Sequence, residues 1–314
     1  MTTALITHTC FVNHDTGEYH PERADRMRVI DKALAHEAFK DLTRREAPLR
    51  TDDEPYIALA HSKEHLEHIR AVAAGRGFGS TNIDADTVVS PGSWEAARRA
   101  VGAGLDAVDI VVNGEAANVF CQVRPPGHHA ERFRAMGFCL FNNAAIAAHY
   151  ARAHHGVDRV AVIDFDVHHG NGTQDIFWSD KDLFYGSTHQ MPLYPGTGAL
   201  NETGSGNVFN APLREGDGRD VFEQAFTERI LGPLHNFAPE LVIISAGFDA
   251  HQDDPLGGLR LVEPDFAWAT EKLAETARRH ANGRIVSMLE GGYNLTALAR
   301  SVAVHVKTLM ETGA

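Results

Sequence analysis

The sequence predicts an α/β fold of a single domain, residues 1–314, with helices on both faces of an open and mainly parallel sheet. Two observations predict this class. Short apolar runs rich in β-branched residues recur along the chain, as expected of parallel strands that are buried on both faces. Longer stretches of helical pattern alternate with these runs, which implies right-handed βαβ units. The 314 residues suffice for one large core, and no internal repeat or linker divides them.

The predicted elements follow one another in a regular order. Six apolar runs, among them ALITH, NVFCQV and LVIISAG, are predicted strands: residues 4–8, 118–123, 159–167, 182–188, 241–247 and 284–291. Five amphipathic patterns are predicted helices: residues 21–39, 93–113, 142–155, 264–280 and 295–310. Two glycine-rich stretches, 75–80 and 195–206, lack the strand-to-helix spacing and the lysine of a phosphate-binding loop. We therefore expect ordinary turns there.

Composition excludes several classes of function. The net charge of −13 speaks against a nucleic-acid partner, because phosphate binding needs clustered Lys and Arg. No run approaches the roughly 18 consecutive apolar residues of a membrane span, and the opening MTTALITHTCFVNHD lacks the features of a signal peptide. The three cysteines, Cys10, Cys121 and Cys139, form no close-spaced pair. A reducing, cytoplasmic location without disulfides is expected.

Charged residues lie at the carboxyl end of the apolar run at 159–167 and just after it. In an extended strand Asp164, Asp166 and His168 share one face, at the carboxyl end where ligands bind in open sheets. Buried carboxylates are costly unless they are paired, hydrogen-bonded or bound to metal. Asp-x-His offers one oxygen and one nitrogen ligand, which suits zinc or ferrous iron. Taken alone, the pattern is more often explained by capping or salt-bridged side chains.

A second run, LVIISAGFD, also ends in a carboxylate, Asp249. Adjacent strand ends can bring Asp166, His168 and Asp249 together and leave a coordination position open. Three protein ligands with one open position are typical of a catalytic zinc site. The alternative is that Asp249 caps a helix after Gly247.

Two further strand ends carry residues suited to catalysis. The loop Pro125-Pro126-Gly127 delivers His128 and His129, whose ordinary pKa near ~6.5 suits a general base and acid. Gly291-Gly292 permits a tight turn that presents Tyr293, whose hydroxyl can donate a hydrogen bond to a developing oxyanion. The alternatives are solvated histidines and a tyrosine that packs in the core or at the rim.

These motifs resemble those of the histone deacetylase family, which has the arginase/deacetylase fold. The resemblance extends from HPERADR through RPPGHHA, GFCLFNNAAIAA, DFDVHHGNGTQDIF, YPGTG and SAGFDAHQDDPLGG to LEGGYN. HPER and DPLGG are similar to the class II-like branch, which includes bacterial deacetylase-like amidohydrolases and acetylpolyamine amidohydrolases. The resemblance implies one catalytic domain over residues 1–314.

The resemblance also implies roles for individual residues. It places zinc, with ferrous iron as an alternative, on Asp166, His168 and Asp249. His129 would be the general base and acid, with His128 as its electrostatic partner, Asp164 orienting His128, and Tyr293 polarising the acyl carbonyl. Asn171 stands where class I members carry a second orienting acid, so it brings no negative charge to His129. We therefore predict a neutral His129.

A monovalent cation and a substrate channel are implied as well. Potassium or sodium would lie near Asp164, Asp166, His168, Ser187 and Thr188. A second cation site near Phe177 is in doubt because Asn207 replaces an expected aromatic residue. The acyl-lysine channel would be lined by Gly137, Phe138, Tyr194 and Leu256. Loops 14–26 and 75–92 are expected to shape its rim, and Cys139 is expected to pack rather than act as a nucleophile.

The leading functional hypothesis is zinc-dependent hydrolysis of an acylated amine, with acetyl-lysine in a protein or peptide as substrate. An acetylpolyamine amidohydrolase is the nearest alternative. Leu256 stands where a polyamine-selective branch has glutamate, but Asp253, Asp254 or an N-terminal loop acid can supply the acidic gate. A binuclear manganese ureohydrolase needs a second ligand set that the sequence lacks. A non-catalytic acyl-lysine or metal-binding module is the third alternative. The physiological substrate, acyl-chain preference, native metal and oligomeric state are not predicted.

Overall fold

The computed structural model describes residues 2–75 and 80–313. Eight strands form one sheet in the order β2-β1-β5-β10-β9-β6-β7-β8, and every neighbouring pair is parallel. Their bounds are β1 Thr3–Thr7, β2 Thr43–Glu46, β5 Asn118–Cys121, β6 Val160–Asp164, β7 Leu183–Gln190, β8 Val208–Leu213, β9 Leu241–Ala246 and β10 Ile285–Leu289. A separate antiparallel pair joins β3 (Thr81–Asn82) to β4 (Val88–Val89). The predicted parallel α/β architecture is confirmed.

All six predicted strands are present, and the two strands of the large sheet that were missed form its edges. The sequence of β2, TRRE, is polar and largely exposed, and β8, VFNAPL, carries Asn210 and Pro212. Edge strands need not be apolar on both faces, and they tolerate proline, so neither segment resembles a buried strand. The inner strands β5, β6, β7, β9 and β10 are buried throughout.

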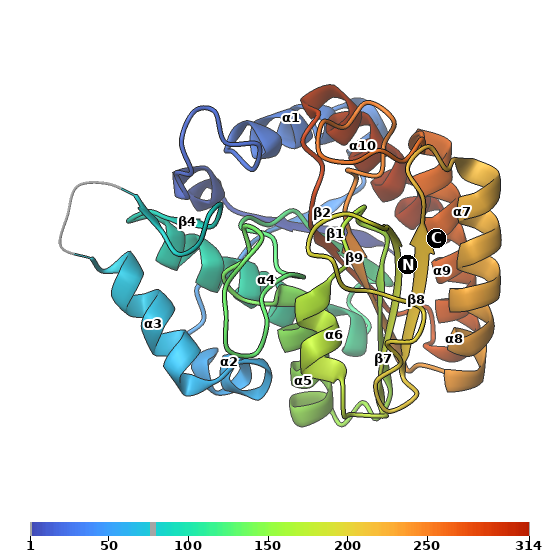
Figure 1. Cartoon of the computed structure of the whole chain (residues 1–314). Coiled ribbons are helices and arrows are strands. Elements are labelled where there is room, and N and C mark those ends of the chain that lie inside the picture. Colours follow the sequence, from blue (N-terminus) through green and yellow to red (C-terminus); the bar gives the residue numbers. More distant parts are fainter. Residues whose placement is uncertain (1, 76–79, 314) are drawn as a thin grey trace.

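Helices cover both faces of this sheet (Figure 1). On one face lie α4 and α5, and on the other α9 and α10, with α1 packed against α10. The helix bounds are α1 Asp25–Leu34, α2 Glu54–Ala60, α3 Lys63–Ala73, α4 Ser93–Val112, α5 Asn143–His155, α6 Asn171–Phe177, α7 Arg219–Ala225, α8 Gly232–Phe237, α9 Glu263–His280 and α10 Leu295–Thr312. A π-helical segment, Phe226–Leu231, joins α7 to α8. Among the described residues, no helix is long and apolar enough to span a membrane.

The predicted helix at 21–39 was wrong in its extent. Residues 21–24 form an irregular segment before α1, and Glu37–Phe39 is a separate 3-10 turn after it. The reason lies in Glu22, whose buried carboxylate accepts hydrogen bonds from Arg26 at 3.0 Å and Arg124 at 2.6 Å. These bonds fix the segment against the interior before the helix begins. The other four predicted helices are confirmed within two residues at each end.

Candidate active site

Asp166, His168 and Asp249 lie together at the carboxyl ends of two neighbouring strands, β6 and β9. All three are buried, and their candidate ligand atoms lie within 4.8 Å of one another. His168 Nδ1 is 3.1 Å from both Asp166 Oδ1 and Asp249 Oδ2. The predicted reason for their proximity was partly wrong, because β6 ends at Asp164 and both Asp166 and His168 lie in the following loop. Their shared direction therefore comes from the loop, not from strand alternation.

This cluster fits a divalent metal ion. Burial raises the pKa of Asp249 to about 7, and the Asp166 carboxylate beside it acts in the same direction. Two carboxylates and an imidazole that converge in this way offer the oxygen and nitrogen ligands that a divalent ion such as zinc takes. Gly247 and Gly291 keep the space open, since a Cβ would lie 2.0 Å from Asp166 Oδ2 at the first and 2.1 Å from Asp249 Oδ2 at the second.

The tandem histidines lie beside this cluster, each with its own hydrogen-bond partner. His128 Nδ1 is 3.0 Å from Asp164 Oδ2, and His129 Nδ1 is 2.8 Å from Asn171 Oδ1. Their ring centroids are 4.0 Å apart. The structure therefore brings together every pair that was predicted for the two histidines.

The surroundings shift the pKa values of the two rings in opposite directions. Burial lowers the pKa of His128, but Asp166 and Asp164 more than offset it and hold that pKa well above its ordinary value. Burial, with the neighbouring His128 and His168, holds the pKa of His129 well below its ordinary value. Of the two rings, His128 is therefore the one whose surroundings favour the charged form, and His129 the one whose surroundings favour the neutral form. Such a division is typical of sites with separate electrostatic and proton-transfer groups.

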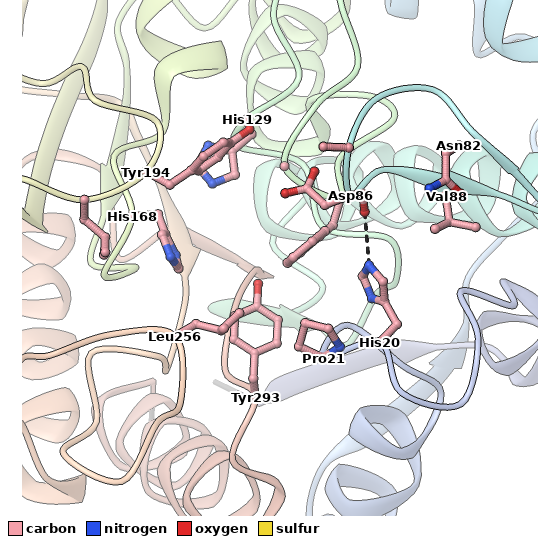
Figure 2. Close-up of a pocket in the computed structure, with 14 residues that line it drawn as sticks. His20, Pro21, Asn82, Asp86, Val88, His129, His168, Tyr194, Leu256 and Tyr293 are labelled. Carbon is pink, nitrogen blue, oxygen red and sulfur yellow. Dashed lines mark hydrogen bonds between the residues drawn. The ribbon is translucent and has the colours of Figure 1, made fainter.

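A cavity of about 390 Å³ opens above these residues (Figure 2). The four predicted channel residues all line it, together with His129, His168 and Tyr293: Gly137, Phe138, Tyr194 and Leu256. The Phe138 and Tyr293 rings meet edge to face at 5.8 Å between centroids. Phe138 has a φ of 68°, which is rare for a bulky residue and marks a conformation imposed by the site. A Cβ at the preceding Gly137 would lie 2.4 Å from His129 Cδ2, so only glycine fits there.

Both predicted rim loops reach the mouth of this cavity. His20 and Pro21 come from the first loop, and Asn82, Asp86 and Val88 come from the second. Residues 76–79 of the second loop lie outside the described residues. His20 Nε2 is 3.0 Å from the Asp86 backbone oxygen and joins the loops, as the dashed line in Figure 2 marks. The HPER motif contains His20 and Pro21, but no motif indicated that they would meet the second loop, because tertiary folding alone brings the two loops together.

The acid candidates after Asp249 do not line the described part of the channel. Asp254 is buried, and its carboxylate accepts backbone hydrogen bonds from Tyr293 at 2.7 Å, Asn294 at 3.0 Å and Leu256 at 3.0 Å. Asp253 is exposed and is not among the described lining residues. Asp254 thus fixes the backbone on two sides of the cavity, and neither residue forms the acidic gate considered for a polyamine substrate.

Two glutamates near the histidines were missed in the sequence. Glu290 is buried and Glu131 is half-buried. Glu290 accepts backbone hydrogen bonds from Gly127 at 2.6 Å and His128 at 3.2 Å, and one from the Ser245 hydroxyl at 3.0 Å. Glu131 accepts a hydrogen bond at 2.6 Å from the Asn171 side-chain amide. Glu290 follows an apolar run as Asp249 does, and that signal could have identified it.

A profile of the histone deacetylase domain matches residues 20–309. The chain belongs to the histone deacetylase family. The chain is 35% identical over 301 residues to a probable deacetylase of Archaeoglobus fulgidus, which covers 94% of this chain and 82% of that protein. It is 40% identical over 255 residues to a histone deacetylase-like amidohydrolase of Pseudomonas aeruginosa, which covers 80% of this chain and 66% of that one.

A solved structure of the same family has nearly the same fold. The crystal structure of the HDA15 HD domain superposes with a TM-score of 0.92 at 36% identity and covers 99% of this chain and 89% of that one. The predicted arginase/deacetylase fold is thereby confirmed, and the chain is a hydrolase of the histone deacetylase family. Its relatives' names include deacetylase and amidohydrolase.

The residues expected around a monovalent cation in this family also lie near one another. Asp164 pairs with Ser187 in the register of β6 and β7, and the buried Thr188 hydroxyl has no hydrogen-bond partner among the described residues. The region of the second cation differs. There the Asn207 side-chain nitrogen lies 2.7–3.0 Å from the backbone oxygens of Phe177, Asp180 and Leu183, and its two hydrogens can serve two of them at a time.

Proposed function

We propose that this chain is a zinc-dependent amidohydrolase that removes acyl groups, acetyl above all, from lysine side chains. The observation that carries the proposal is that His129, Tyr293 and His168 line one cavity, with His168 joined to Asp166 and Asp249 in a buried cluster. Zinc on the three ligands would polarise a carbonyl oxygen and acidify a water molecule. Ferrous iron suits the same ligands.

The protein's own groups would supply proton transfer and charge stabilisation. A neutral His129 can take a proton from the attacking water through Nε2, and the same ring can return it to the leaving amine. His128, held charged by Asp164 and Asp166, adds positive charge where negative charge develops. Burial raises the pKa of Tyr293 well above its ordinary value, so its hydroxyl remains a hydrogen-bond donor to the oxyanion.

A potassium or sodium ion near Asp164 and Ser187 is part of the proposal. The Asp164 carboxylate is fully buried, and the partnerless Thr188 hydroxyl adds an oxygen donor nearby. Such a cation would balance the Asp164 and Asp166 charges beneath the histidines. Dialysis into a buffer with only tetramethylammonium, followed by addition of K⁺, should restore activity in a saturable manner.

Acetyl-lysine fits the lining of the cavity. The walls are formed by Phe138, Tyr194 and Leu256, which suit an aliphatic stem, and the polar groups lie at the bottom. The test is acetate release from an acetyl-lysine peptide by zinc-loaded protein. A rate no higher than that of the Tyr293→Phe variant would refute the proposal.

Acetylpolyamine hydrolysis is a second candidate because Asp86 lines the cavity mouth. Its carboxylate can accept a hydrogen bond from a distal ammonium group of a polyamine. We would compare kcat/KM for acetylspermidine and for the peptide in the wild type and in Asp86→Asn. A polyamine enzyme should lose about tenfold on acetylspermidine in that variant, the size of one charge-assisted contact of about 1.5 kcal/mol. Equal, small losses on both substrates would count against it.

The remaining alternatives have less support among the described residues. A binuclear ureohydrolase needs a second ligand group at the same cavity, but the other two described groups contain His8 and Asp109, neither of which lines it. A non-catalytic module would not need His129, Asn171 and Tyr293 arranged around a metal-binding cluster. Hydrolysis therefore accounts for more of the site than binding does.

A further inference from the structure

Glu131 lies behind the His129–Asn171 pair and contacts it through one carboxylate oxygen only. Its Oε1 accepts the hydrogen bond from Asn171 Nδ2 at 2.6 Å, while Oε2 faces the exposed Arg134 at 3.0 Å. The backbone holds Glu131 in place, since its N–H donates to the Arg134 oxygen at 2.9 Å and its own oxygen lies 2.9 Å from His61 Nδ1. The carboxylate is about a quarter exposed.

Glu131, Asn171 and His129 form a series of hydrogen bonds, and Glu131 sets which group donates at each step. An ionised carboxylate can only accept, so the group of Asn171 that faces Glu131 must be the NH₂. The Asn171 carbonyl oxygen then faces His129 Nδ1 at 2.8 Å and can only accept in turn. A neutral imidazole that donates through Nδ1 carries its lone pair on Nε2.

We infer that Glu131 is a positioning residue that selects the His129 tautomer protonated on Nδ1 and so keeps Nε2 free as the base. This inference rests on the proposed function for the role of that base, but the tautomer itself does not. For class I relatives, the resemblance implies that an acid bonds the histidine directly. In this chain the negative charge of Glu131 acts on His129 through the Asn171 amide. Nearby Met136 Sδ, 3.3 Å from Asn171 Nδ2, is a weak acceptor and cannot impose the same orientation.

Glu131→Leu removes the acceptor and allows the Asn171 amide to rotate. We would label the histidines of zinc-loaded protein with ¹⁵N and assign His129 by difference from the His129→Asn variant. The wild type should show one tautomer at pH 7.5, with hydrogen on Nδ1. Glu131→Leu should show a second population with hydrogen on Nε2, and its kcat on an acetyl-lysine peptide should fall by roughly 10- to 100-fold with little change in KM.

Matched variants separate this role from simple support of the loop. Arg134→Met removes the other partner of the same carboxylate and should leave both the tautomer and kcat unchanged. Asn171→Asp in the Glu131→Leu background places an obligate acceptor against His129 directly, and it should restore the Nδ1 tautomer and most of the lost kcat. Glu131→Gln, whose carbonyl can still accept, should lie between the wild type and Glu131→Leu.

The outcomes distinguish this inference from the proposed function. A single Nδ1-protonated tautomer in Glu131→Leu, with kcat within about twofold of the wild type, would overturn the inference while the deacylase assignment stood. A wild type without activity whose tautomer still changes in Glu131→Leu would support the inference and overturn the function. Failure of Asn171→Asp to restore the tautomer would also count against the inference.

Discussion

The Glu290 carboxylate accepts the backbone N–H of Gly127 at 2.6 Å and thereby ties the histidine loop to the end of β10. The same oxygen accepts the His128 N–H at 3.2 Å. On the other side of the loop, a Cβ at Gly127 would lie 2.6 Å from the Asn143 backbone nitrogen. The loop is therefore held between Glu290 and the start of α5, and His128 and His129 inherit their positions from it.

Replacement of Glu290 should separate its hydrogen bonds from its charge. Glu290→Leu leaves two buried N–H groups without an acceptor, which costs about 1–3 kcal/mol each, and should lower both stability and kcat. Glu290→Gln can keep an oxygen toward these N–H groups and its NH₂ toward Ser245. We expect Glu290→Gln to retain most of the wild-type thermal stability and more activity than Glu290→Leu. Equal losses in both variants would show that the charge matters more than the hydrogen bonds.

Tyr293→Phe removes one hydrogen-bond donor without changing the shape of the cavity. Loss of an oxyanion donor typically costs about 10²–10³ in rate, so kcat should fall by that factor while KM changes little. The packing against Phe138 is kept, so the fold should be unchanged, and circular dichroism provides the control. Unchanged turnover would remove Tyr293 from the chemistry.

The pH dependence of kcat/KM should report the neutral state of His129. The base must be unprotonated to act, and its pKa is held well below the ordinary value of 6.5. Activity should therefore persist as pH falls from neutrality through 6.5 and decline only at lower pH. Zinc content at each pH controls for loss of metal. An acid limb with a pKa above about 8 would contradict a neutral His129 at working pH.

Glu22 should be important for stability rather than chemistry. Burial raises its pKa, but Arg124 and Arg26 lower it to about 2. Glu22→Gln would leave two buried guanidinium groups without their anion and should destabilise the fold by about 3–5 kcal/mol in urea unfolding. Because the folded pKa is depressed, this contribution is fully present above the ordinary pKa of 4.5 and is lost as pH falls toward 2. A variant as stable as the wild type at pH 7 would contradict this account.

The centre of the fold was predictable because burial on both faces produces apolar runs that are visible in the sequence. The edge strands β2 and β8 lack that signal, because TRRE is polar and largely exposed and VFNAPL contains Asn210 and Pro212. The proposed metal ligands were predictable for a related reason: carboxylates at the ends of apolar runs, such as Asp166 and Asp249, conflict with burial unless something compensates them.

Residues that act through long-range contacts were not predictable from one sequence. Glu131 and Asn171 are 40 positions apart, and nothing in either segment indicates that their side chains meet. The same holds for His20 and Asp86, which two separate loops bring to the cavity mouth. Asp254 was considered as a channel acid, but its position in the chain did not reveal that its carboxylate turns inward to backbone N–H groups.

Acetate release from an acetyl-lysine peptide by zinc-loaded protein, with Asp249→Asn beside it, tests the central claim most directly. Bound zinc should be measured in the same samples. The account predicts turnover and bound zinc in the wild type, and the loss of both in Asp249→Asn, because an amide replaces one of the two anionic groups among the three proposed ligands. Turnover in Asp249→Asn equal to that of the wild type would contradict a hydrolase that works through this metal-binding cluster.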